Sequence, residues 1–154
     1  MYISLVRPNL EYASQVWSPY KVGEINSIEG VQKFALRMCA KNWDANYEEL
    51  LQLFSVPNMQ QRRAYLDLCS MFRIIHGLFH FPDNIYCHND VQRVTRSSNP
   101  HSFICPFACT CYYYNSYVPR SIRLWNSLPT SLTNNTVISS ISLFKSNIRA
   151  HVYH

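Results

Sequence analysis

Residues 58–80 read NMQQRRAYLDLCSMFRIIHGLFH, and this stretch decides the fold class. Its apolar side chains recur at the spacing of one face of an α-helix rather than alternating as in a strand. The stripe comprises Met59, Leu66, Cys69, Phe72, Ile75 and Phe79. An amphipathic helix buries such a stripe against other elements, so we expect this stretch to be the long central helix of the domain.

Other segments show the same periodicity. Pro8 would interrupt a helix from within, so we expect it in the first turn of an N-terminal helix. Glu29 and Lys33 stand at the spacing of a helical i,i+4 pair. We predict helices at about 8–17, 22–40, 46–54 and, in the C-terminal helical region 117–154, at 116–128 and 139–152.

Residues 81–116 lack a helical period and contain three prolines. We therefore predict extended chain and loops there, with a short strand at about 102–105 as one option. No internal repeat or clear linker divides the chain. The predicted fold is mainly α, a small bundle of about five helices in one domain, with a long irregular and partly extended segment at 81–116.

Composition narrows the function classes. The chain of 154 residues is 47% hydrophobic and 15% charged, which is typical of a globular protein. With only three glycines it has no glycine-rich phosphate cradle, and we expect no cofactor. Arg7 and Glu11 interrupt the apolar N-terminus, so we expect neither a signal peptide nor a membrane partner. We expect the protein inside the cell, in nucleus or cytoplasm, with its cysteines as thiols.

Charge is distributed unevenly along the chain. The formal net charge is +5, and every Asp and Glu lies at or before Asp90. The later residues Arg93, Arg96, Arg120, Arg123, Lys145 and Arg149 have no carboxylate among them. This excess would favour a polyanion weakly and without sequence specificity, although ordinary surface charge is the simpler explanation.

Four arginines are the candidates for nucleic-acid contact. Arg62 and Arg63 open the central helix, while Arg120 and Arg123 lie one turn apart and near a run of tyrosines at 112–114. Guanidinium groups contact phosphates and tyrosine rings stack on unpaired bases. Aromatic residues in such numbers also build cores, so both interpretations stay open.

Potential catalytic and metal-binding groups are less convincing. Glu48 and Glu49 are adjacent but are typical of a solvated helix face. His76 and His80 stand four apart, and further potential zinc ligands follow at Cys87, His88, His101, Cys105, Cys109 and Cys111. Their spacing fits no standard zinc site, so we predict no metal site, with a small zinc protein as a third interpretation.

Three segments carry a family resemblance. They are LVRPNLEYASQVWSPY at 5–20, IEGVQKFALRMC at 28–39 and YVPRSIRLWNSLP at 117–129. In this order and at these separations they resemble the C-terminal part of reverse transcriptases from non-LTR (LINE-like) retrotransposons. The resemblance covers nearly the whole chain, to the final segment SLFKSNIRAHV.

The resemblance implies a non-catalytic piece of an RNA-directed DNA polymerase. In that family this region follows the polymerase palm, which holds the paired catalytic aspartates, and this chain has no Asp-Asp pair. Two-metal nucleotidyl transfer needs such carboxylates. We therefore expect a truncated remnant that is no enzyme, with no catalytic residues and weak RNA or DNA binding through Arg62, Arg63, Arg120 and Arg123. Trp17 and Trp125 would be structural. The alternative is a non-enzymatic helical interaction protein.

Overall fold

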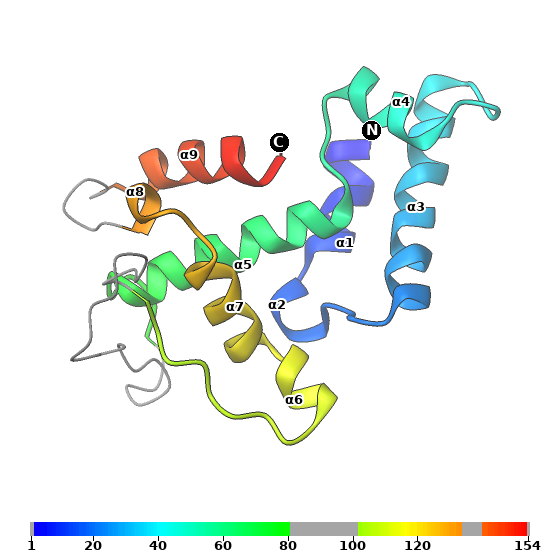
Figure 1. Ribbon diagram of the computed structural model, residues 1–154. Coiled ribbons are helices and arrows are strands. Elements are labelled where there is room, and N and C mark those ends of the chain that lie inside the picture. Colours follow the sequence, from blue (N-terminus) through cyan, green and yellow to red (C-terminus); the bar gives the residue numbers. More distant parts are fainter. Residues whose placement is uncertain (1, 81–101, 134–139, 154) are drawn as a thin grey trace. The chain divides into compact units, whose positions relative to one another are not determined.

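The computed structural model describes residues 2–80, 102–133 and 140–153 (Figure 1). These residues are mainly helical and contain no strand, which confirms the predicted fold class of a small helical bundle. The chain divides into two compact units, Met1–Arg63 and Ala64–His154, and the division falls inside one helix, α5 (Met59–Ile75). In the described residues, no helix combines the length and apolar character needed to cross a membrane.

The first unit has a small core. It contains a π-helical turn η1 (Tyr2–Val6), α1 (Arg7–Glu11), α2 (Ser14–Trp17), α3 (Val22–Ala40), α4 (Tyr47–Phe54) and the first residues of α5. Its buried apolar cluster consists of Tyr2, Ala35, Leu36, Leu50 and Val56. The helices at 22–40 and 46–54 form almost as predicted, with α4 beginning one residue later.

The N-terminal helix predicted at 8–17 is not continuous. The backbone breaks between α1 and α2, where Ala13 adopts the left-handed conformation at φ 50°. The Trp17 indole Nε1 donates to the Tyr12 carbonyl oxygen at 2.6 Å across this break. Pro8 does lie in the first turn of α1, as expected.

Helices of the first unit end without glycine. Lys41 follows α3 at φ 53° and Ser55 follows α4 at φ 49°, both in the left-handed region that favours glycine. The central helix α5 does end with a glycine, Gly77 at φ 66°, and the Leu78 N–H bonds back to the Arg73 carbonyl at 2.8 Å. This closure stops the helix at Ile75, short of the predicted His80.

The second unit has a larger, aromatic core. It contains the rest of α5, then α6 (Cys111–Asn115), α7 (Tyr117–Asn126), α8 (Thr130–Thr133) and α9 (Ile141–Tyr153). Phe144 on α9 stacks on both Phe72 and Trp125, with ring centroids 4.3 and 5.8 Å away. Trp125 is only 1% exposed, so it is the core residue that the sequence predicts.

The region predicted as extended chain and loops is partly helical. Residues 81–101 lie outside the described residues, but 111–115 form α6, which the sequence analysis missed. No strand forms at 102–105. Instead the Asn126 side chain accepts from the Phe103 N–H at 3.0 Å and donates to its carbonyl at 2.8 Å. Phe103 also forms an isolated β-bridge, which is too short to count as a strand.

Candidate nucleic-acid interface

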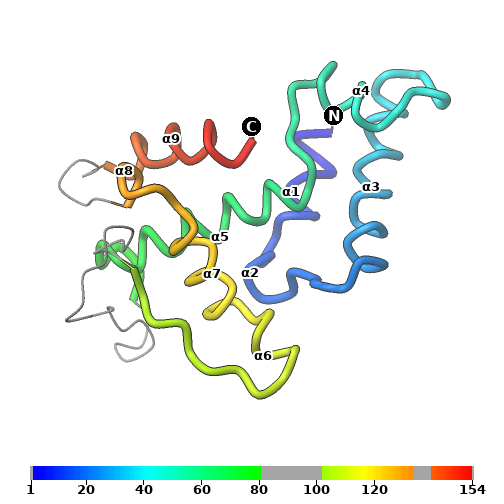
Figure 2. The backbone as a smooth tube through the Cα atoms, viewed as in Figure 1, coloured from blue at the N-terminus to red at the C-terminus, as the bar shows by residue number. Residues whose placement is uncertain are grey.

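The clearest candidate surface lies on α6 and α7 of the second unit. Thr110 caps α6, because its hydroxyl oxygen accepts from the Tyr113 N–H at 3.2 Å. The helix presents three tyrosines, of which Tyr112 is 71% exposed, Tyr113 44% and Tyr114 48%. Figure 2 traces the backbone from α6 into α7, the helix that carries Arg120 and Arg123.

Arg123 has no carboxylate partner among the described residues. Its guanidinium carbon lies 3.7 Å from the centroid of the Tyr114 ring, in cation–π geometry. Its Nη1 donates to the Tyr114 carbonyl oxygen at 2.7 Å. The Tyr114 ring and the Tyr114 carbonyl orient the guanidinium but carry no negative charge. Arg123 therefore places a positive charge directly beside an aromatic ring that could stack on a base.

Arg120 has a different environment, although it is only three residues away. Its Nε donates to the Asp67 carboxylate at 2.8 Å, and its Nη1 donates to the Asn115 carbonyl at 2.8 Å. The Asp67 side chain is only 2% exposed and that of Arg120 17%. Arg120 therefore neutralises a buried acid and ties α7 to α5, which leaves little of it for a phosphate.

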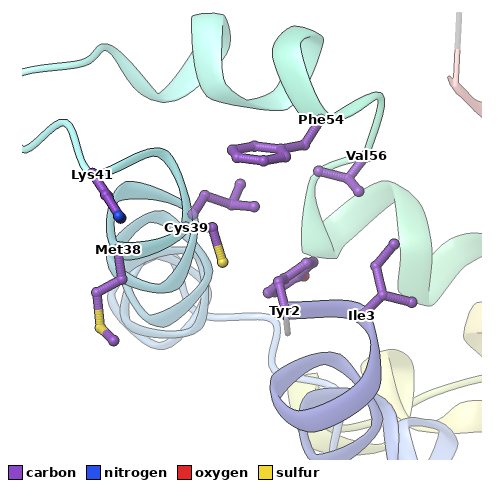
Figure 3. A pocket seen from close by; sticks show the side chains of 8 residues that line it. Tyr2, Ile3, Met38, Cys39, Lys41, Phe54 and Val56 are labelled. Carbon is purple, nitrogen blue, oxygen red and sulfur yellow. The ribbon is translucent and has the colours of Figure 1, made fainter.

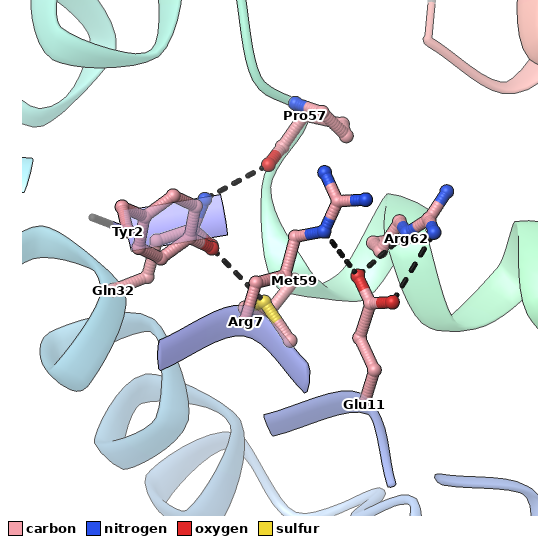
Figure 4. Close-up of polar contacts among 7 residues, drawn as sticks. All are labelled: Tyr2, Arg7, Glu11, Gln32, Pro57, Met59 and Arg62. Atoms are coloured by element: carbon pink, nitrogen blue, oxygen red, sulfur yellow. Dashed lines mark hydrogen bonds and ion pairs between the residues drawn. The ribbon is translucent and has the colours of Figure 1, made fainter. Parts of the chain in front are cut away.

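The other two predicted arginines lie at the start of α5 and are also engaged in the fold. Arg62 donates to both oxygens of Glu11, at 2.6 and 3.1 Å, and Arg7 binds the same carboxylate at 3.1 Å (Figure 4). Arg63 is 3% exposed. Neither side chain is presented to solvent as a phosphate contact would require.

The charge excess is concentrated in the second unit. Lys and Arg number seven in each unit, against six Asp and Glu in Met1–Arg63 and three in Ala64–His154. Asp67 is the only acid of this unit within the described ranges, and it pairs with Arg120. Burial raises the pKa of the Tyr65 phenol, and Arg149, whose guanidinium carbon lies 5.8 Å from the centre of the Tyr65 ring, opposes this shift.

The described residues do not assemble a metal centre. They contain no group of three or more His, Cys, Asp or Glu side chains placed to hold a metal ion. Cys105, Cys109 and Cys111 are exposed thiols, while Cys87, His88 and His101 lie outside the described residues. The His76 ring packs on Phe72 at 4.0 Å between centroids, which makes it a core neighbour.

Glu29, which the sequence analysis pairs with Lys33 on one helix, instead connects several parts of the first unit. Glu29 accepts from the backbone N–H groups of Met59 and Gln60, at 3.1 and 2.9 Å, and so caps α5 from another helix. It also accepts from the Tyr47 hydroxyl, and burial together with this bond raises the pKa of Tyr47. Only the tertiary fold reveals this role.

An apolar groove between η1 and α3 was also missed by the sequence analysis. Figure 3 shows Cys39 pointing into a cavity of about 500 Å³, with Tyr2 and Phe54 around it. A second cavity of about 150 Å³ shares Tyr2, Met38 and Cys39 with the first. The exposed Val31, Phe34 and Met38 on α3 interrupt its polar face, and that pattern is the signal that could have indicated the groove.

The residues that carry the family resemblance hold the fold together. Glu11 pairs with Arg62, and the Gln32 side chain donates to the Pro57 carbonyl at 3.0 Å (Figure 4). Trp125 is a core ring and Asn126 binds the Phe103 backbone. No family model, curated protein or solved structure matches this chain.

Proposed function

We propose that this chain is a non-catalytic remnant of the C-terminal part of a LINE-like reverse transcriptase, and that its second unit binds single-stranded RNA or DNA weakly. The observation that carries the proposal is the Arg123 guanidinium held on the Tyr114 ring beside Tyr112 and Tyr113. Stacking rings combined with unneutralised positive charge are what single-strand binding uses.

The distribution of charge supports the same surface. The only acid that the described part of the second unit contains is buried with Arg120, so no carboxylate there opposes a phosphate backbone at α6. Exposed tyrosine faces accept any base, which fits binding without sequence preference. The chain has no Asp-Asp pair, and the proposed role is therefore to hold a strand and not to extend it.

A fluorescence-anisotropy titration of the full chain tests the proposal. The probes are a labelled single-stranded RNA and the same sequence as a duplex, each at two salt concentrations. We expect tighter binding of the single strand and an affinity that falls with salt, with a slope of about −0.7 per phosphate contact. Absence of salt-dependent binding to either probe would refute it.

Three variants locate the site. Tyr113→Ala should weaken single-strand binding by about 1–3 kcal/mol, the range of one stacked base. Arg123→Gln should reduce the salt slope by about 0.7, since it removes one phosphate contact. Tyr12→Ala removes a tyrosine that is 81% exposed in the first unit and keeps its backbone carbonyl, so it should bind like the parent chain.

The second candidate is a non-enzymatic interaction protein. The observation that favours it is the apolar groove between η1 and α3. In addition, three of the four arginines predicted to contact nucleic acid are engaged in the fold by carboxylates or by burial. A zinc protein is the third candidate. Metal analysis of the purified full chain tests it, and stoichiometric zinc would be needed to sustain it.

A further inference from the structure

The exposed face of α3 carries a line of large apolar side chains. Val31 is 47% exposed, Phe34 56% and Met38 43%, at positions i, i+3 and i+7 of the helix. Phe34 also packs on Trp43, 56% exposed, with ring centroids 5.6 Å apart. Single exposed apolar residues are normal on a surface, whereas a contiguous line of them marks an interaction site.

The side chains of Val31, Phe34 and Met38 line the edge of a surface cavity. The two cavities between η1 and α3, of about 500 and 150 Å³, meet at Tyr2, Met38 and Cys39 (Figure 3). Their lining on α3 runs from Val31 to Cys39, which is about 12 Å of helix at 1.5 Å per residue. An elongated apolar groove of about two turns matches the side of a helix better than it matches a compact ligand.

The charge at the groove indicates which helix fits. Among the described residues that line the two cavities, Lys41 is the only charged one and none is a carboxylate. Figure 3 shows the Lys41 side chain at the α3 end of the larger cavity. An occupant with an acidic residue at that end would complement the groove, and one with a basic residue there would be repelled.

We propose that the groove between η1 and α3 is the docking site for an amphipathic helix of a protein partner. That helix presents large aliphatic side chains at i, i+3 or i+4 and i+7, and an acidic residue that meets Lys41. The inference does not depend on nucleic-acid binding by the second unit, and it gives the interaction-protein alternative a defined surface.

Two designed peptides serve as probes for the full chain. Both are about 18 residues long, above the length at which isolated helices are marginal, and share one leucine stripe. One carries Glu beside the stripe and the other carries Lys. By fluorescence anisotropy we expect the acidic peptide to bind on the order of tenfold more tightly than the basic one. Equal affinity for the two peptides, or no binding of either, would overturn the proposal.

Variants on one helix identify the surface. Phe34→Glu should weaken binding of the acidic peptide on the order of tenfold, and Lys41→Glu should reverse the preference between the peptides. Val22→Glu is the matched control, because Val22 lies on α3, is 72% exposed and lines neither cavity. All three sites are exposed, and circular dichroism checks that each variant is folded. An effect of Val22→Glu as large as that of Phe34→Glu would contradict the assignment.

Thiol alkylation places the bound peptide within the molecule. Cys39 lines both cavities, whereas Cys105, Cys109 and Cys111 are exposed in the second unit. The acidic peptide should slow the reaction of Cys39 with iodoacetamide and leave the other three rates unchanged, as read by mass spectrometry of digested chain. Uniform slowing of all four, or a concentration-dependent dimer that Phe34→Glu abolishes, would assign the groove to another occupant and overturn the proposal.

Discussion

The two units are stabilised in opposite ways. The first has a small apolar cluster and is held by polar connections, in which Glu29 caps α5, Gln32 binds the Pro57 carbonyl and Glu11 joins two arginines. The second has a cluster of stacked rings with one buried ion pair. Both units expose apolar side chains, such as Phe34 in the first and Phe107 in the second, but in the second unit exposed tyrosines on α6 also lie beside the positive charge of Arg123.

The tryptophans give the largest contrast between the units. Trp125→Ala should destabilise the second unit by about 3–5 kcal/mol, because it removes a ring that is 1% exposed and stacked on Phe144. Trp17→Ala should lower the free energy of unfolding of the first unit by about 1 kcal/mol, because Trp17 is 38% exposed and the variant loses one hydrogen bond, to the Tyr12 carbonyl. Urea unfolding followed by circular dichroism measures both. Similar losses for the two variants would contradict the proposed division between the units.

The buried ion pair gives the next largest effect. Arg120→Met should lower the free energy of unfolding by about 3 kcal/mol, because it removes the cation that pairs with the buried Asp67 carboxylate. This is the lower end of the range for buried pairs, since the Arg120 side chain is partly exposed. The double variant Arg120→Met with Asp67→Leu should regain most of that loss in urea unfolding. A double variant no more stable than the single one would show that the carboxylate is not the source of the penalty.

Two glutamates on one helix test the polar connections of the first unit. Glu29→Gln should lower the free energy of unfolding by about 1 kcal/mol, as loss of a helix cap does. Glu24→Gln, whose partner Lys21 lies 3.9 Å away on an exposed surface, should change it by less than about 0.5 kcal/mol. Thermal unfolding of both variants measures the difference. Equal effects would remove Glu29 from the proposed role in joining α3 to α5.

The smallest effect at neutral pH concerns Tyr2. Burial raises the pKa of Tyr2 from 10.0 to about 12, so the folded first unit prefers the neutral phenol. Its contribution to stability is complete below about pH 10 and is lost as the pH rises from about 10 to about 12. Tyr2→Phe should change the free energy of unfolding little at pH 7, because the Tyr2 hydroxyl donates to the Met59 sulfur at 3.8 Å, a weak acceptor. Above pH 10 the variant should lose less stability than the parent chain, because it has no phenol to ionise. Urea unfolding at pH 7 and at pH 10.5 compares the two chains.

Periodicity predicted the long helices well because amphipathic spacing is a local property. Residues 22–40 form α3 as predicted, and the buried side of α7 with Trp125 follows the same rule. The errors arose where backbone conformation decides the outcome. Gly77 closes α5 early, and Ala13 breaks the N-terminal helix although alanine favours helices. Both breaks are local changes of backbone conformation, which the spacing of apolar residues does not record.

The candidate site was only partly predictable. The sequence identified Arg120 and Arg123 together, but it could not tell them apart. The fold does so, because Asp67 lies 53 positions away in the chain and reaches Arg120, while Arg123 faces the Tyr114 ring. In the same way the Glu29 carboxylate meets the start of α5, 30 positions later, and takes on a role that helical spacing does not suggest.

The left-handed residues that flank helices of the first unit have a consequence for protein engineering. At Ala13, Lys41 and Ser55 a side chain occupies a conformation that costs an L-residue about 1–2 kcal/mol, while glycine would lose about 0.5–1 kcal/mol of chain entropy on folding. The balance favours glycine at each position. Ala13 and Ser55 are therefore a reserve of stability that the natural chain has not used, because neither lines the groove or lies on α6, whereas replacing Lys41 would remove the charged residue that lines the larger cavity.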